Sequence, residues 1–141
     1  MSLSNIFGIA GSALNAQLVR LNLTASNIAN SSTLSTNEAE AYKAKRPVFK
    51  ALLDRETPQL HKQYAGGVKI DRIVDDSAAG TKLFDPTHPQ ADADGYLYRS
   101  NVNEITEMVE MMAASRSYQN NVEVVNTARE LMQRTIDIIK A

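Results

Sequence analysis

The feature that most constrains this chain is a long helical apolar pattern at its N-terminus that carries almost no charge. Between residues 1 and 37 the only ionisable side chain is Arg20. Apolar side chains recur at alternating four- and three-residue steps over residues 3–30, which predicts a helix with a coiled-coil seam. A helix in water normally presents charged residues on its outer face. This segment is therefore either the buried central helix of a globule or a helix surrounded by copies of itself.

A second helical pattern covers residues 101–140. Its apolar seam also follows alternating three- and four-residue steps, and it is interrupted at Ser115 and Arg129. Asn101, followed three residues later by Glu104, matches an Asn variant of the capping box and is predicted to cap the start of this helix. At 1.5 Å per residue the two predicted helices are about 40 Å and about 60 Å long.

Both predicted helices carry a second apolar row beside the seam, with Ile9 and Leu23 in the first helix and Val109 and Leu131 in the second. Two helices that pair along one seam leave these rows uncovered, and exposed apolar surface of that size usually marks an interaction site. We therefore expect self-assembly or a large partner. The residues predicted to pair the helices and to support assembly are Phe7, Leu14, Leu18, Leu21, Ile28, Met108, Met111, Tyr118, Val122, Val125, Met132 and Ile136.

The middle of the chain has a different pattern, with short β-prone runs separated by turn residues. "YKAKRPVFKALL" and "GGVKIDRIVDD" alternate apolar and polar residues, and "TKLF" and "YLY" are short β-prone runs. The predicted fold is therefore mainly α with a small β-hairpin-rich insert, and the long terminal helices pair as a coiled-coil-like hairpin. The predicted division is 1–30 plus 101–141 as paired terminal helices, 31–41 as a linker loop and 42–100 as the β-rich insert.

Composition excludes several classes of protein. The net charge of −1 and the pI near 6.1 provide no basic surface for nucleic acid or for an anionic membrane. The absence of cysteine excludes disulfides, thiolate metal sites and a cysteine nucleophile. The N-terminal segment lacks a basic n-region, and polar residues interrupt its apolar pattern, so it is neither a secretory signal nor a membrane span. We expect no nucleic-acid partner and no insertion into a lipid membrane.

The segment "QADADGYLYRSN" partly matches a calcium-binding EF-hand loop. Asp92, Asp94 and Gly95 fit the third, fifth and sixth positions of such a loop. Gln90 and Asn101 then occupy the first and twelfth positions, where carboxylates are needed. A turn in which the Asp side chains accept hydrogen bonds from nearby amides is the preferred interpretation.

Signals for catalysis are weak. His88 could hold a metal only if Asp85 or Asp92 closed around it, and an exposed polar loop is the simpler interpretation. Neither a Gly-x-Ser-x-Gly elbow nor a His-Glu-x-x-His helix is present. The chain is therefore predicted to be non-enzymatic and to bind no metal or other cofactor.

Three segments carry a resemblance to a known family: "NIFGIAGSALNAQLVRLNLTASNIAN" at 5–30, "GGVKIDRIVDD" at 66–76 and "FDPTHPQADADGYLYRSNVNEITEMVEMMAASRSYQNNVEVVNTARELM" at 84–132. They resemble the bacterial flagellar basal-body rod proteins, specifically the proximal rod protein C type. The resemblance extends over nearly the whole chain, and the third segment is its most specific part.

The resemblance implies a non-enzymatic structural subunit of the proximal rod of the bacterial flagellar basal body. Such a subunit passes unfolded through the flagellar type III export apparatus without a cleaved signal peptide. It then polymerises helically in the periplasm and transmits motor torque toward the hook. The implied partners are copies of itself, other flagellar rod proteins and the rod-base/export-gate junction protein.

The resemblance also explains the uncharged amides and hydroxyls near the end of the first helix. In a helical array Asn27, Asn30 and Ser31 can bond between subunits or to backbone without the cost of burying charge. Asn27 and Asn30 can also end the helix in left-handed conformations. Two other functions stay open from the residues alone. One is a helical adaptor of a type III export system that does not polymerise, and the other is a metal-dependent enzyme centred on His88.

Overall fold

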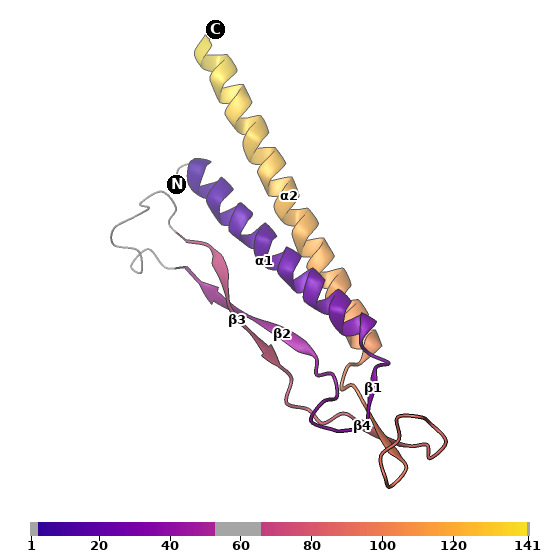
Figure 1. Ribbon diagram of the computed structural model, residues 1–141. Coiled ribbons are helices and arrows are strands. Elements are labelled where there is room, and N and C mark those ends of the chain that lie inside the picture. The colour runs from indigo at the N-terminus through magenta and orange to yellow at the C-terminus, as the bar shows by residue number, and fades with distance from the viewer. Residues whose placement is uncertain (1–2, 53–65, 141) are drawn as a thin grey trace. The chain divides into compact units, whose positions relative to one another are not determined.

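The computed structural model describes residues 3–52 and 66–140. Both predicted helices are present, and the predicted β-prone runs form strands between them (Figure 1). In chain order the elements are α1 (Leu3–Ala29), β1 (Leu34–Ser35), β2 (Lys45–Ala51), β3 (Val68–Asp75), β4 (Thr81–Phe84), β5 (Tyr96–Arg99) and α2 (Glu104–Lys140).

Helix α1 ends without the predicted left-handed asparagine. Asn30 N donates to both Ser26 O and Asn27 O, each at 3.1 Å, and the Asn30 side chain donates to Ser26 O at 2.8 Å. These bonds satisfy the last carbonyls of the helix directly. Among the described residues only glycines have positive φ, so the expected left-handed conformations of Asn27 and Asn30 are wrong.

Helix α2 begins two residues later than the capping pattern predicts. Its cap is Asn103, whose Oδ1 accepts from Thr106 N at 3.1 Å. The prediction that Asn101 and Glu104 form the cap is therefore corrected. The Asn101 side chain instead accepts from Ala44 N at 2.7 Å and donates to two backbone carbonyls, because tertiary neighbours supply its partners.

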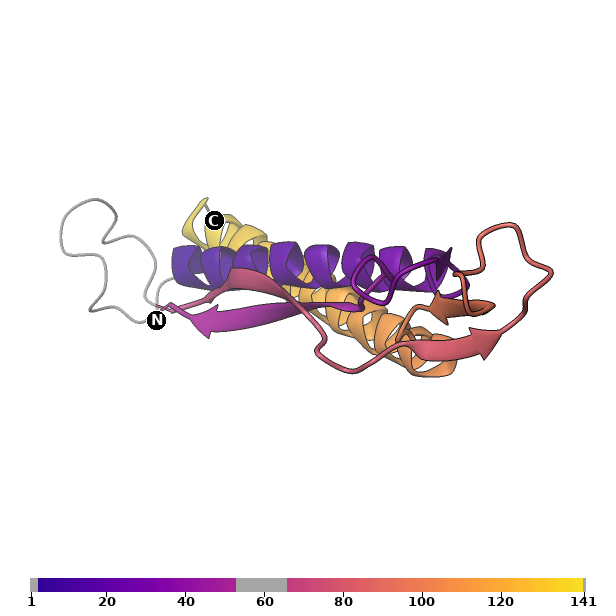
Figure 2. The ribbon, with the colours of Figure 1, turned by 60° about the horizontal axis from the view of Figure 1, so that its bottom comes forward.

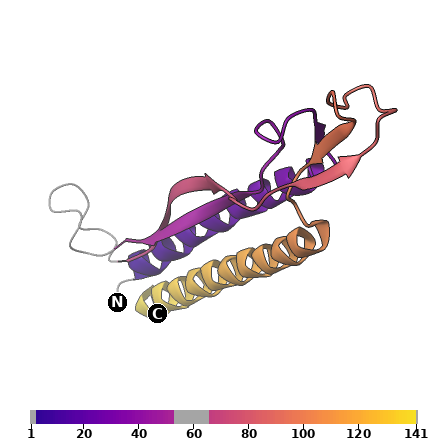
Figure 3. The same cartoon turned by 90° about the horizontal axis from the view of Figure 1, so that it is seen from below.

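One sheet has the strand order β1-β5-β4, and both pairings are antiparallel. The β4–β5 hairpin, whose strands are salmon pink and orange in Figure 3, pairs Leu83 with Leu97, and Leu97 is fully buried. Strand β1 pairs Leu34 with Arg99 inside the segment that was predicted to be a loop. That prediction is corrected, because a two-residue strand is too short to produce a visible alternation in sequence.

The second sheet consists of β2 and β3, the two magenta strands in Figure 2. Leu52 N donates to Gly67 O at 2.9 Å beyond one end of the ladder, and Asp76 N donates to Ala44 O at 2.7 Å beyond the other. These bonds fix an antiparallel register. Gly67 has φ +136°, and a Cβ added there would lie 2.9 Å from Ser12 Oγ, so this position requires glycine.

The chain separates into two compact units. The first contains described residues within 1–19, 48–72 and 113–141, and the second contains 20–47 and 73–112. Each unit therefore takes part of α1, part of α2 and part of the β2–β3 ladder. The predicted division into paired terminal helices, linker and insert stays a prediction. Among its described residues, the buried apolar side chains of the first unit are all alanines, namely Ala10, Ala16, Ala114 and Ala128.

Candidate assembly interface

In the second unit three glutamates lie at three-residue intervals on one face of α2. Residues at this spacing are neighbours on a helix surface. We call this set the glutamate ladder. Each carboxylate meets a polar side chain from the last turns of α1 or just after it: Glu104 meets Ser31 at 2.5 Å, Glu107 meets Asn27 at 3.0 Å and Glu110 forms an ion pair with Arg20. The glutamate ladder therefore fixes the antiparallel register of the two helices within this unit.

Asn27 is the centre of this network and is 1% exposed. Its Nδ2 donates to Lys45 O at 3.1 Å and to Glu107 Oε2 at 3.0 Å. Its Oδ1 accepts from Lys45 N at 2.9 Å and from Tyr42 OH at 3.0 Å. An amide offers two donors and two acceptor positions, and all four are used here. This explains an amide at this position, because a carboxylate could not donate.

Glu107 is buried as deeply as Asn27, and its second oxygen has an ionic partner. Glu107 Oε1 accepts no hydrogen bond, but it lies 2.9 Å from Arg46 Nη1. Arg46 Nε also lies 3.8 Å from Oδ2 of Asp76, the residue just after β3. A buried charge is costly unless it is paired. Arg46 therefore secures the start of β2 to the buried carboxylate of α2.

The predicted subunit-contact motif, Asn27, Asn30 and Ser31, is largely used within one chain. Ser31 is buried, and its backbone oxygen accepts from Ser100 Oγ at 2.6 Å and from Arg99 Nε at 3.2 Å. Together with the glutamate ladder, these bonds occupy Asn27 and Ser31. A role of this motif in contacts between subunits stays a prediction.

The predicted seam residues are buried to different degrees in the single chain. Phe7, Leu14, Leu21 and Ile28 of α1 are half-buried, as are Met111, Tyr118, Val122 and Val125 of α2. The exposed seam residues are Leu18, Met108, Met132 and Ile136. Pairing of the helices through a continuous coiled-coil seam stays a prediction.

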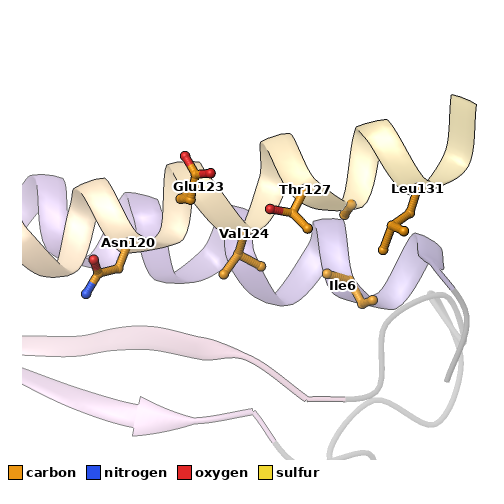
Figure 4. Close-up of a pocket in the computed structure, with 7 residues that line it drawn as sticks. Ile6, Asn120, Glu123, Val124, Thr127 and Leu131 are labelled. Atoms are coloured by element: carbon orange, nitrogen blue, oxygen red, sulfur yellow. The ribbon is translucent and has the colours of Figure 1, made fainter.

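The first unit contains an open apolar groove between the start of α1 and the later turns of α2. Its volume is about 350 Å³, and Figure 4 shows Ile6 of α1 beside Val124 and Leu131 of α2. Asn120, Glu123 and Thr127 also line the groove. The groove brings together no set of acid, base and nucleophile, and its lining suits an apolar side chain of a partner.

The segment from 85 to 95 forms a series of tight turns around its aspartates. Asp92 Oδ1 accepts from Asp94 N at 3.0 Å and from Tyr96 N at 2.7 Å, and Gly95 has φ +77°. The predicted turn is therefore confirmed in place of a calcium loop. Within the described residues, no three His, Asp or Glu side chains gather as a metal site.

The neighbouring turn uses Asp85 and His88 in the same way. Thr87 Oγ1 donates to Asp85 Oδ1 at 2.7 Å, and this bond lowers the pKa of the Asp85 carboxyl. Because the ionised form is favoured in the folded chain, the turn weakens as the pH falls through that lowered pKa. His88 Nδ1 accepts from Gln90 N at 3.1 Å, so its ring supports the backbone of the turn.

His88→Ala is expected to change the free energy of unfolding by about 1 kcal/mol or less, the net value of one hydrogen bond. Urea unfolding of the variant and a swimming assay of cells that carry it test this expectation. Normal swimming agrees with a turn-supporting histidine. Loss of swimming by a variant of unchanged stability would instead indicate a functional site at His88.

The sequence pattern indicates neither the contacts of the glutamate ladder nor the residues at the start of β2 that bind to it. The predicted cap role of Glu104 does not indicate its contact with Ser31. Two signals were present in the sequence: Arg20 stands alone in a charge-free segment, and Glu104, Glu107 and Glu110 recur at i, i+3 spacing. Neither signal identifies the partner residue.

In the part of the chain that the structure describes, no helix is both long and apolar enough to cross a membrane.

Comparison with known proteins agrees with the resemblance in the sequence. Residues 7–34 match the family described as flagella basal body rod protein, and residues 93–138 match flagellar basal body rod FlgEFG protein C-terminal. Relatives include the flagellar basal-body rod protein FlgC of Yersinia enterocolitica, 46% identical over 138 residues, and that of Salmonella typhimurium, 42% identical over 138 residues. The FlgC protein of Buchnera aphidicola subsp. Acyrthosiphon pisum is 47% identical over 140 residues. Each of these alignments covers 98% of both chains. The chain therefore belongs to the FlgC family of flagellar basal-body rod proteins.

Proposed function

We propose that this chain polymerises helically as a subunit of the proximal rod and transmits motor torque toward the hook. The observation that carries the proposal is its similarity to FlgC proteins along 98% of the chain. Membership of this family makes the chain a structural rod protein and not an enzyme. As a rod protein it belongs to the flagellar basal body.

The exposed apolar residues of α2 support polymerisation. Leu131, Ile138 and Ile139 are exposed in the single chain, as are the predicted seam residues Met132 and Ile136. Exposed apolar patches on soluble chains usually mark contact surfaces. We propose that the seam residues pack the terminal helices within and between subunits as an axial layer. Burial of each Leu or Ile side chain stabilises such a contact by about 1.5–3 kcal/mol.

The partners follow from the same proposal. They are copies of this chain, other flagellar rod proteins and the rod-base/export-gate junction protein. The chain reaches the periplasm through the flagellar type III export apparatus with its N-terminus uncleaved. Its formal net charge of −1 and its interrupted apolar N-terminus agree with a protein that binds neither nucleic acid nor the interior of a lipid membrane.

Electron microscopy of basal bodies from a strain that lacks this gene tests the proposal. We expect rings without a complete rod, and we expect the rod to return in the complemented strain. Complete rods in the deletion strain would contradict the proposal and favour an adaptor of the export system that does not polymerise. Immunoblots for the chain in the complemented strain control for expression.

A further inference from the structure

The first three turns of α2 expose their apolar face and direct their acidic face inward. The glutamate ladder meets the end of α1 on one side of the helix. At 100° per residue, positions 105, 108, 109 and 112 lie on the opposite side. Their side chains are Ile105, Met108, Val109 and Met112, exposed by 75%, 48%, 55% and 56%. We call these four residues the outward apolar patch.

This orientation is the reverse of an ordinary amphipathic helix, which buries its apolar stripe. It follows from the polar contacts, because turning the patch inward would remove Glu107 from Asn27 and Arg46. The described residues of one chain therefore cannot bury the patch and keep the glutamate ladder. Exposed apolar patches of this kind mark surfaces that bind another molecule.

The charge pattern limits what that surface can be. The patch and the residues between its members on the same face carry no charge. A partner that placed a charged group against it would leave that charge without a partner. The covering surface must therefore be free of charge and must leave room for the long side chains of Ile105 and Met108.

One such surface is present in the same unit of the chain. Asn22, Ala25 and Ala29 are exposed on α1 at i, i+3 and i+7, so they share one face of the helix. Arg20, the only ionisable side chain among the first 37 residues, is paired with Glu110. The side chains on this face are short and uncharged. Other exposed segments of the unit carry charged groups, among them Glu38, Glu40, Lys43, Lys82, Asp94 and Arg99.

We propose that the outward apolar patch of one copy packs against the Asn22, Ala25 and Ala29 face of a second copy. The two surfaces are different, so the contact is heterologous and can continue from copy to copy as an open helical array. The inference rests on the proposed function and adds the pair of surfaces that joins successive copies. Small side chains on one helix accept large side chains of the other, which permits a close helix–helix approach.

Disulfide cross-linking tests this pairing directly, because the natural chain contains no cysteine. The double variant Ala25→Cys/Met108→Cys is expressed in the deletion strain, and cells are treated with a mild oxidant and with a short bis-maleimide. We expect dimers and larger products at least about tenfold above either single variant, since two thiols held in contact have an effective concentration in the millimolar range. The pair Ser77→Cys/Met108→Cys is the matched control, because Ser77 is exposed but lies outside both surfaces.

The possible outcomes separate this inference from the proposed function. Dimers from Met108→Cys alone would indicate an isologous contact between two patches and would overturn the pairing. Cross-linked products that contain a different protein would overturn the pairing as well. The absence of any cross-linked product in cells that form complete rods would also overturn it. In each of these three cases swimming cells with complete rods would leave the proposed function intact. If rods form without the gene, the proposed function itself fails.

Discussion

Asn27→Asp is expected to lower the free energy of unfolding by about 3–5 kcal/mol, the range for a buried ionic contact that loses its partner. The substitution keeps the size of the side chain but replaces the donating Nδ2 with an oxygen. That oxygen lies at the position 3.0 Å from Glu107 Oε2 and loses the bond to Lys45 O. Two buried carboxylates then face each other, so one of them must take up a proton. Urea unfolding of the purified chain, followed by far-ultraviolet circular dichroism, measures the change.

Two further variants control this experiment. Asn37→Asp makes the same chemical change at an exposed turn where Oδ1 accepts from Ala39 N, so we expect a change within about 0.5 kcal/mol. Adding Glu107→Gln to Asn27→Asp returns a donor to the contact, and we expect about half of the lost stability to return. Equal stability of Asn27→Asp and Asn37→Asp would show that the buried network does not hold α1 to α2.

Gly80→Ala is expected to lower the free energy of unfolding by about 3 kcal/mol, which is the upper end of the typical range for substitutions that overpack a site. A Cβ at this position would lie 2.2 Å from Arg99 O and 3.3 Å from Arg99 C, which are both backbone atoms. Arg99 is held in β5 between β1 and β4, so its backbone cannot move without breaking ladder bonds. Thermal or urea unfolding of the variant gives the size of the effect.

The matched control for this variant is Gly11→Ala in the exposed part of α1. A Cβ there meets no atom within 4 Å, so only helix propensity changes. We expect the free energy of unfolding to rise by about 1 kcal/mol. Similar destabilisation of both variants would show that a general loss of glycine flexibility, and not the close approach to Arg99, sets the cost at Gly80.

The long helices could be predicted from the sequence because their signal is repeated along the chain. Each turn of α1 and α2 adds another apolar residue at helical spacing, so an error at one position changes little. The runs that form β2 and β3 were visible as alternation of apolar and polar residues, and those that form β4 and β5 as short β-prone runs. The two-residue strand β1 and the cap at Asn103 were missed, because each depends on only one or two residues. For the cap, the nearby Asn101 matches the same capping pattern.

The glutamate ladder is the clearest case of a site that sequence reasoning could not complete. Its contacts join residues 73, 80 and 90 positions apart. A spacing of three residues places the glutamates on one helix face, but it does not say which face is buried. The assumption that apolar residues point inward assigned Met108 to the pairing seam, whereas the structure leaves it half-exposed.

The sequence by itself determined the two helices, the uncharged character of the first, the apolar rows of both, the strands between them except β1, and the family. These properties depend on the local spacing of residues and on composition, and both can be read from the sequence without knowledge of tertiary contacts. The tertiary structure alone decided that Asn27 bonds to Glu107 and Lys45, and therefore that α2 presents Ile105 and Met112 outward. The physical reason is that a buried carboxylate needs several specific partners at once, and that demand outweighs the gain from burying the apolar face of the same helix.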